Sequence, residues 1–331
     1  VAFSSWFVGG WASVLGKRVP LPDLNGRVYC VTGGSRGVGW QVAARLAEAG
    51  ATVILTSRSL ERSKAAALLI CRSHASKVVP MIVDLESFDS IRAFAQQLQR
   101  RFGRLDGLVL NGGVARSFLD CGGFRVTAHG FEQMIGVNYL GNVQCCELLL
   151  PLLRATAGAR VVALSSAASA NSYPCGVDYE SWRRRVPGYT DWAQYGQSKL
   201  ALALYVQELQ RREPSLLALA CHPGVAWTGL TEHRGRWLDA VYAAFVYGML
   251  GMRLEQTAMS PLYCLVAGLG ELNGGLVEGT GVLVPGGLYH PVGRPGFLTH
   301  WFQRVGALQM PVQVHVEHPD LWARTQAAPC Q

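Results

Sequence analysis

A buried strand that runs into a glycine-rich turn and then into a helix restricts the fold of this chain most strongly. Residues 27–32 are mainly apolar, glycine stands at 33, 37 and 39, and residues 40–49 have a helical pattern. Glycine lets the backbone turn sharply, and a helix N-terminus offers amide donors and a partial positive charge. Glycine triplets alone are usually ordinary turns. The position between strand and helix instead favours a turn that cradles phosphates.

The same alternation of strand and helix continues along most of the chain. After the first unit we predict helices that end near residue 73 and that cover 88–101, 128–153 and 254–267. The predicted strands cover residues 27–32, 51–56, 78–83, 107–110, 160–164, 216–221 and 281–284. Strands that alternate with helices pair in parallel through right-handed crossovers. The fold class is therefore α/β: a Rossmann-like doubly wound, mainly parallel seven-stranded sheet with helices on both faces.

Length and composition fit one large domain with extensions as well as they fit two domains. The chain has 331 residues, of which 50% are hydrophobic and 16% charged, so it can bury a large core. We place the Rossmann-type domain at 26–285, with a loop or short-helix insertion at 169–190 and a lid region at 225–253. The glycine- and proline-rich residues 286–331 form a C-terminal extension.

Residues 1–25 form an N-terminal apolar extension. Its apolar part, Val1–Leu15, is shorter than the roughly 20 residues that span a bilayer. It could be the end of a longer anchor, an interfacial segment or a strap packed on the domain. The apolar segment Trp237–Met252 is also too short to span a bilayer, and we interpret it as a lid helix rather than a core helix because it follows a strand's carboxyl end.

Charge and cysteine content bear on partners and compartment. The net charge of +8 comes from scattered arginines, and the tight run Arg183–Arg185 stands alone, so a solvated face is favoured over a nucleic-acid interface. The charge also suits an anionic phosphate cofactor or peripheral contact with an acidic membrane. Nine cysteines without Cys-x-x-Cys spacing indicate reduced thiols and no zinc site. We expect an intracellular protein, cytosolic or associated with an intracellular membrane.

A tyrosine and a lysine four residues apart suggest proton-transfer chemistry. Tyr195 and Lys199 would lie on one helical face, and Ser166 follows a strand some thirty residues upstream. A phenol with a pKa near 10 needs about 4 kcal/mol of help to exchange protons near neutrality, and one ammonium about 4 Å away supplies about that much. Each residue alone has an ordinary structural explanation. Together they predict an acid or base, an activating cation and a hydroxyl donor at one carbonyl.

These segments, in this order, resemble the short-chain dehydrogenase/reductase family over about residues 26–228. Thr32-Gly33 to Gly39 is similar to its Thr-Gly-x-x-x-Gly-x-Gly turn, Asn111-Gly112-Gly113 to its Asn-Ala-Gly, and Tyr195 to Lys199 to its Tyr-x-x-x-Lys pair. Tyr195–Ala201 and His222–Val225 resemble the retinol-dehydrogenase-like branch. Leu110 and Gly112 depart from the usual asparagine and alanine, which should weaken packing beneath the cofactor more than chemistry.

The resemblance implies a catalytic tetrad of Asn138, Ser166, Tyr195 and Lys199. In it Tyr195 passes the proton, Ser166 bonds the substrate oxygen, Lys199 also holds the ribose hydroxyls and Asn138 fixes a water. The cofactor-binding residues it implies are Gly33, Ser35, Arg36, Gly37, Val38, Gly39, Arg58, Asp84, Leu85, Asn111, Gly112, Gly113, Tyr195, Lys199, Pro223, Gly224, Val225 and Thr228. The long helices of this family commonly form dimer faces, so a homodimer is an open expectation beside a monomer.

Cofactor choice depends on the end of the second strand. Enzymes that use NAD place a carboxylate there for the ribose 2′-hydroxyl, but this chain has Thr56-Ser57-Arg58, and Arg36 lies in the glycine turn. An arginine can bond a 2′-phosphate, so we predict NADP(H). Arg58 as a plain surface residue is the alternative.

The substrate is expected to be a lipophilic carbonyl or alcohol, such as a retinoid, steroid or other lipid. Apolar residues dominate 225–252, and Trp182, Tyr189 and Trp192 lie in or beside the insertion, so we expect these segments to line an apolar pocket. Hydride would move between the nicotinamide and the carbonyl carbon. The alternative is a nucleotide-binding sensor or scaffold with little turnover, against which the intact Tyr195 and Lys199 argue.

Overall fold

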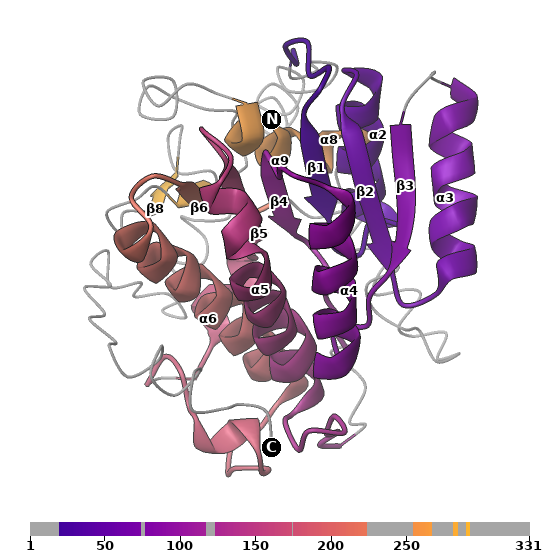
Figure 1. Ribbon diagram of the computed structural model, residues 1–331. Coiled ribbons are helices and arrows are strands. Elements are labelled where there is room, and N and C mark those ends of the chain that lie inside the picture. Colours follow the sequence, from indigo (N-terminus) through magenta and orange to yellow (C-terminus); the bar gives the residue numbers. More distant parts are fainter. Residues whose placement is uncertain are drawn as a thin grey trace, which may run out of the picture.

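The computed structural model describes residues 20–73, 77–116, 123–173, 175–223, 254–266, 281–283 and 289–291. One sheet organises them, with the strand order β3-β2-β1-β4-β5-β6-β7-β8 (Figure 1). The parallel strands are β1 (Val28–Val31), β2 (Thr52–Ser57), β3 (Lys77–Ile82), β4 (Gly107–Leu110), β5 (Arg160–Leu164) and β6 (Leu217–Cys221). The chain order reverses between β1 and β4, where such sheets bind ligands at their carboxyl ends.

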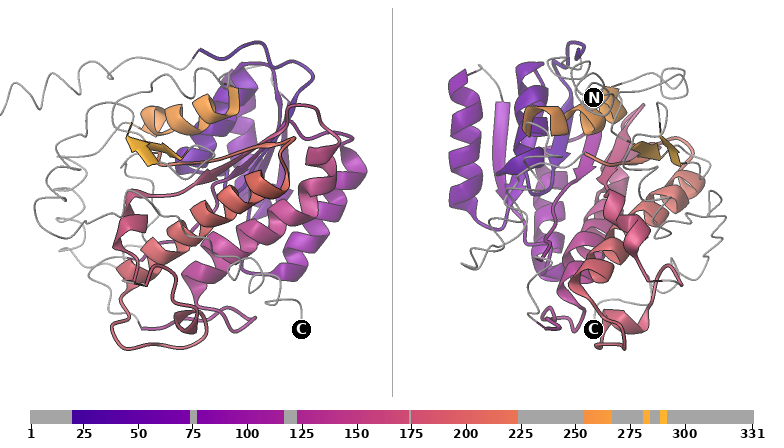
Figure 2. Two further views of the ribbon diagram at one scale, coloured as in Figure 1. Left: turned by 90° about the vertical axis from the view of Figure 1, so that its left-hand side faces the viewer. Right: turned by 180° about the vertical axis from the view of Figure 1, so that it is seen from behind.

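Helices cover both faces of the sheet, as Figures 1 and 2 show. One face carries α4 (Phe88–Arg101), α5 (Asn142–Arg154) and α6 (Asp191–Arg212). The other carries α2 (Gly37–Glu48), α3 (Leu60–Ser73), α8 (Leu254–Thr257) and α9 (Met259–Val266). The layers confirm the predicted Rossmann-like architecture.

The side chains of β1 show why the central strands of the sheet are apolar throughout. Val28 and Cys30 belong to the core cluster on the α4–α6 face, whereas Tyr29 and Val31 belong to the cluster on the α2–α9 face. Successive strand side chains point to opposite faces, so a central strand covered on both sides must be apolar throughout. The unbroken apolar run in the sequence reflects this double burial.

The predicted count of seven strands is wrong. Two antiparallel strands, β7 (Gly281–Leu283) and β8 (Tyr289–Pro291), extend the six parallel ones. The first is the strand predicted at 281–284. The second lies beyond residue 285, in the segment predicted as an extension. Three residues within a glycine- and proline-rich sequence give too short an apolar pattern to predict β8.

Two helices also differ from their predicted bounds. The segment predicted as one helix at 254–267 divides into α8 and α9 around Ala258. Pro261 lacks the amide hydrogen that would bond the Thr257 carbonyl, and its ring crowds that carbonyl. The helix predicted from residue 128 instead contains the π-helical turn η1 (Ile135–Gly141), which continues into α5. Such turns interrupt α-helices mostly at functional sites.

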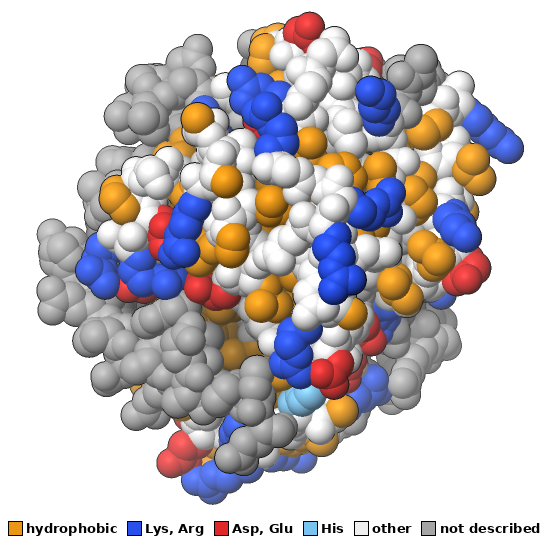
Figure 3. Space-filling model, viewed as in Figure 1, with side chains coloured by type: hydrophobic (Ala, Val, Ile, Leu, Met, Phe, Trp, Pro, Cys, Tyr) orange, Lys and Arg blue, Asp and Glu red, His pale blue; other side chains and the backbone are white. Residues whose placement is uncertain are grey.

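Basic side chains are scattered over the face that carries α4 and α5, between acidic and hydrophobic ones (Figure 3). Several are paired, as in the ion pairs Arg154–Glu213, Arg211–Glu208 and Arg212–Glu147. No basic stripe runs across the described part of this face. This distribution gives no support to a nucleic-acid interface.

Candidate active site

Helix α6 carries the tyrosine and the lysine. It begins where the Thr190 hydroxyl accepts a hydrogen bond from the Ala193 amide at 3.0 Å, and Arg211 and Arg212 occupy its last turn. Both features stabilise a helix at its ends. Tyr195 and Lys199 are buried on one face, with Nζ of Lys199 5.9 Å from the centre of the Tyr195 ring. Tyr195 and Lys199 therefore lie on one side of α6, one helical turn apart.

Burial lowers the pKa of Lys199 to about 8. Its Nζ donates to the carbonyl oxygen of Leu164, the last residue of β5, at 2.8 Å. A neutral carbonyl compensates a buried ammonium only in part. Lys199 is therefore a cation whose charge the fold leaves available to an adjacent phenolate or hydroxyl group.

Ser165 and Ser166 follow β5 at the same edge of the sheet. The hydroxyl of Ser165 donates to the backbone oxygen of Lys199 at 3.0 Å, which ties the strand end to α6. Ser166 precedes the short helix η2 (Ala167–Asn171), and its Oγ accepts from the Ala168 amide at 3.2 Å. A hydroxyl that accepts one bond still has a proton to donate. Ser166 can therefore supply a donor beside the tyrosine helix.

Asn138 is fully buried in η1, where its side chain joins two segments. Its Oδ1 accepts from the amide of Val114 at 2.7 Å, and its Nδ2 donates to the Val114 carbonyl at 2.9 Å and to Oγ of Ser198 at 3.0 Å. Ser198 directly precedes Lys199 in α6. The side-chain amide thus positions the loop after β4 against α6.

Gly196 lets the serine segment and the tyrosine helix approach closely. A Cβ at this position would lie 2.4 Å from the carbonyl oxygen of Ala168 and 3.1 Å from the carbonyl carbon of Asn171. Both are backbone atoms of η2, which cannot rotate away as a side chain can. The residue directly after Tyr195 must therefore lack a side chain for Ser166 to reach its place.

Replacing Gly196 with alanine is expected to destabilise the fold by about 1–3 kcal/mol and to lower activity, because η2 must move away from α6. Urea denaturation and turnover measure the two effects. Gly103→Ala is the matched control, since no atom lies within 4 Å of a Cβ there. Equal stability of both variants would contradict the close approach.

The glycine turn fits a diphosphate. Gly33 and Gly37 have φ values of +63° and +58°, which favour glycine. Helix α2 begins after Arg36 without a side-chain cap and without an acidic residue in its first turn. The amides of its first turn, at Gly37, Val38 and Gly39, can therefore bind an anion.

A buried hydrogen-bond network that the sequence did not reveal holds this turn in place. Oγ1 of Thr32 accepts from the amides of Asn111 and Gly112, both at 2.9 Å, and contacts Oδ1 of Asn142 at 3.1 Å. Asn111 was predicted to bind the cofactor, but its Nδ2 donates to the backbone oxygens of Thr32 and Gly33. It shapes the turn through these bonds. The sequence gives only a weak signal for this network, because Thr32, Asn111 and Asn142 each resemble an ordinary turn residue when considered alone.

Two departures from the family pattern have a steric account. Leu110 is fully buried at the end of β4. A Cβ on Gly112 would lie 2.5 Å from Cδ1 of Leu85, so the leucine side chain occupies the space of an alanine methyl group. A Cβ on Gly113 would lie 3.0 Å from Oδ1 of Asn138. The contacts at Leu110 and Gly112 are close, and their effect on cofactor packing and on chemistry stays a prediction.

The other predicted cofactor residues that the structure describes follow strands at the same edge of the sheet. Arg36 and Arg58 are exposed, and Ser35 and Asp84 are half-buried. Oδ1 of Asp84 accepts from the Glu86 amide at 3.0 Å. Pro223 is half-buried just after β6. The predicted residues Gly224, Val225 and Thr228, the lid region at 225–253 and residues 1–19 lie outside the described residues.

The aromatic residues of the insertion divide between core and site. Trp182 was predicted to line a pocket, but it is buried in the main core, where it packs edge-on against Tyr139. Tyr189 is also buried and enters a polar network. Trp192 stacks on Tyr195 with ring centres 5.9 Å apart. Of these three, Trp192 is the one in contact with the tyrosine of the site.

The chain is similar to known proteins. The model of the short chain dehydrogenase family matches residues 27–191. Retinol dehydrogenase 13 of Mus musculus is 37% identical over 245 residues, which cover 73% of this chain and 69% of that protein. The chain belongs to the short-chain dehydrogenase/reductase family. It is an oxidoreductase of the retinol-dehydrogenase-like branch, and the family uses a nicotinamide cofactor.

Two further proteins are similar to this short-chain dehydrogenase/reductase. Polyprenol dehydrogenase of Mus musculus is 34% identical, with 75% of this chain and 73% of that protein covered. The Pseudomonas aeruginosa RhlG/NADP active-site complex has a TM-score of 0.58 and 28% identity, and covers 74% of this chain and 92% of that one. Among the described residues, no helix is long and apolar enough to cross a membrane.

Proposed function

We propose that this enzyme is an NADP(H)-dependent oxidoreductase that interconverts a lipophilic carbonyl compound and its alcohol. The buried pair of Tyr195 and Lys199, at the carboxyl edge of the sheet, is the observation that carries the proposal. The glycine turn and the first turn of α2 would hold the diphosphate. The retinol and polyprenol dehydrogenases among the relatives support a lipophilic substrate.

The chain's own residues account for the proton chemistry. Tyr195 would donate its phenol proton to the carbonyl oxygen during reduction, or accept it during oxidation. Ser166 would hydrogen-bond that oxygen as negative charge develops on it. The Lys199 ammonium would stabilise the phenolate and hold the ribose hydroxyls, and Asn138 would keep the loop after β4 in register. The bound nicotinamide supplies the hydride.

The end of β2 supports the proposed preference for NADP(H). Ser57 and Arg58 stand where NAD enzymes place a carboxylate, and the Ser57 hydroxyl is bonded to the Ser59 carbonyl at 2.7 Å. Arg36 and Arg58 are both exposed, so their guanidinium groups are accessible to a 2′-phosphate. We also propose an intracellular location, peripheral contact with a membrane and a homodimer.

Replacing Arg58 with Glu should weaken NADPH binding at least about ten-fold and leave NADH binding nearly unchanged, because one charge-assisted bond contributes about 1.5–3 kcal/mol. Titration of purified protein, followed by nicotinamide fluorescence, measures both affinities without a substrate. Arg100→Glu is the matched control, because Arg100 is exposed in the last turn of α4, at the opposite edge of the sheet. Unchanged discrimination in Arg58→Glu would contradict the assignment, and binding of neither nucleotide would remove the proposed function itself.

A further inference from the structure

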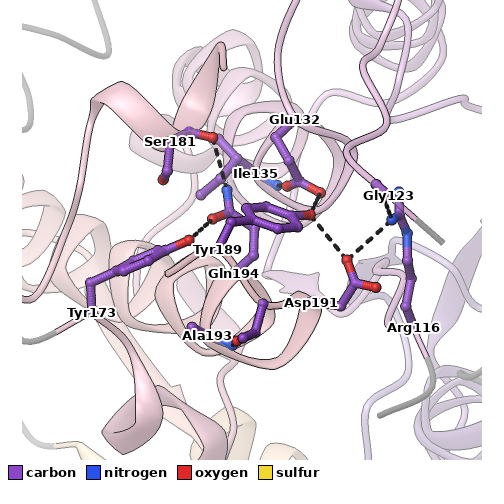
Figure 4. A network of polar contacts seen from close by, with 11 residues as sticks. Arg116, Gly123, Glu132, Ile135, Tyr173, Ser181, Tyr189, Asp191, Ala193 and Gln194 are labelled. Atoms are coloured by element: carbon purple, nitrogen blue, oxygen red, sulfur yellow. Dashed lines mark hydrogen bonds and ion pairs between the residues drawn. The ribbon is translucent and has the colours of Figure 1, made fainter. Parts of the chain in front are cut away.

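Four buried polar residues surround the first turn of α6. We call them the buried carboxyl cluster: Arg116, Glu132, Tyr189 and Asp191 (Figure 4). The Tyr189 hydroxyl lies 3.0 Å from Oδ1 of Asp191 and 3.4 Å from Oε1 of Glu132. Nη1 of Arg116 lies 3.1 Å from the same Oδ1. Glu132 is fully buried, and the side chains of Arg116 and Asp191 are only 6% and 8% exposed.

The cluster connects the segments that carry the proposed tetrad. Glu132 precedes η1, which holds Asn138, and its Oε2 accepts from the Ile135 amide at 3.0 Å. Asp191 is the first residue of α6, one helical turn before Tyr195. Arg116 lies two residues after Val114, whose backbone bonds the Asn138 side chain. A shift within the cluster would therefore change the distance between η1 and the tyrosine helix.

Counting protons assigns the state of Glu132. The Tyr189 hydroxyl has one proton but faces two carboxyl groups, and the shorter contact is to Asp191. When Glu132 carries a proton, its O–H donates to Tyr189, Tyr189 donates to Asp191, and Arg116 compensates the charge of Asp191. When Glu132 is ionised, two carboxylates compete for the single phenol proton and for one guanidinium. Only the neutral form supplies a proton for each of the two contacts of the Tyr189 hydroxyl.

The electrostatic surroundings agree with this count. Burial raises the pKa of Glu132 to about 7, against the opposing effects of Arg116, the Gln194 side chain and the amides of Met134 and Ile135. Burial raises the pKa of Tyr189, and the negative charge of a neighbouring carboxylate raises it further, so this phenol keeps its proton. Burial also raises the pKa of Tyr173, which lies on the other side of Gln194. On the η3 side (Glu180–Trp182), Arg183 stacks on the ring of Phe131, next to Glu132. These groups face Glu132 from each element packed around it.

We propose that Glu132 is a positioning residue whose protonated carboxyl group holds η1 and the first turn of α6 together for catalysis. Loss of its proton weakens the contact with Tyr189, so the tyrosine helix loosens as the pH rises. The proposal rests on the proposed function, because it concerns the geometry of that same tetrad.

The test compares wild type, Glu132→Gln and Glu147→Gln between pH 6 and pH 8.5. A glutamine at 132 keeps an acceptor for the Ile135 amide and always donates to Tyr189, so it imitates the protonated acid. The ratio of the Glu132→Gln kcat to the wild-type kcat is expected to rise on the order of ten-fold from pH 6 to pH 8.5. The wild type loses the Glu132 proton over this range, and the resulting misplacement of catalytic groups lowers its kcat. KM for NADPH should stay constant in both proteins. Glu147 accepts from the Tyr205 hydroxyl on α6 and from Arg212, so Glu147→Gln removes a comparable carboxylate far from Asn138 and should parallel wild type.

Thermal unfolding of the same proteins tests the cluster without a substrate. Because the pKa of Glu132 is higher in the folded protein than its ordinary value of 4.5, its proton stabilises the fold most fully below pH 4.5. That stabilisation is lost as the pH rises through about 7. The Tm of Glu132→Gln should therefore rise relative to wild type by several degrees from pH 5 to pH 8.

The outcomes separate the two proposals. A ratio of kcat values that stays constant with pH, in an active enzyme, overturns the positioning role of Glu132. A pH-dependent Tm difference in a protein that binds NADPH but reduces no carbonyl compound overturns the proposed function and confines the cluster to stability. A Tm difference that does not change with pH overturns the assigned protonation.

Discussion

Replacing Tyr195 with phenylalanine is expected to reduce turnover by about 10² to 10⁴-fold while NADPH binding changes little. The substitution removes the acid or base of the reaction, and positioned proton transfer contributes an effect of that size. The ring itself is retained, so it still stacks on Trp192 and packs against Met134 and Ala168. Carbonyl reduction followed at 340 nm and a fluorescence titration with NADPH measure the two quantities.

Tyr29→Phe serves as the control for this prediction. It removes a buried phenol from β1, in the other core cluster, and should leave kcat near the wild-type value. A Tyr195→Phe enzyme with nearly full activity would show that another group moves the proton. Loss of NADPH binding in the same variant would instead indicate that the phenol mainly orders the nucleotide site.

The sheet could be predicted because its signals are local. Each central strand is buried on both faces, which gives an unbroken apolar run, as in residues 28–31. Tyr195 and Lys199 lie on one helix, so their spacing alone places them on one face. Ser166 could be added because it follows a predicted strand at the same edge of the sheet.

The parts that were missed depend on contacts between distant segments. Glu132 and Tyr189 are 57 residues apart, and Thr32 and Asn142 are 110 apart. Their polar side chains resemble ordinary turn or cap residues until the fold buries them together. Trp182 was placed in a pocket because an aromatic residue in a loop gives no sign of which way it points. The sequence offered one signal for Glu132: this glutamate directly precedes an apolar helical segment, and an apolar helix must be buried.

Replacing Lys199 with methionine is expected to abolish turnover and yet to stabilise the nucleotide-free protein by about 2 kcal/mol at pH 7. Burial lowers the pKa of this lysine from 10.5 to about 8, which corresponds to about 3 kcal/mol of unfavourable desolvation. Loss of the hydrogen bond to the Leu164 oxygen returns about 1 kcal/mol of that gain. Activity and stability should thus change in opposite directions, as at other strained functional sites.

The pH dependence of this gain distinguishes desolvation from better packing. Between pH 8 and pH 10.5 the unfolded chain holds the lysine proton that the folded protein has already released, so the stability of the wild type rises with pH in that window. The advantage of Lys199→Met should therefore be largest below pH 8 and shrink as the pH is raised toward 10. Urea denaturation at pH 7 and pH 9.5 measures it, with Lys64→Met on the exposed side of α3 as the control. A stability gain that is equal at both pH values would mean that methionine simply packs better than lysine, and a loss at pH 7 would mean that the Leu164 contact outweighs the desolvation of the ammonium.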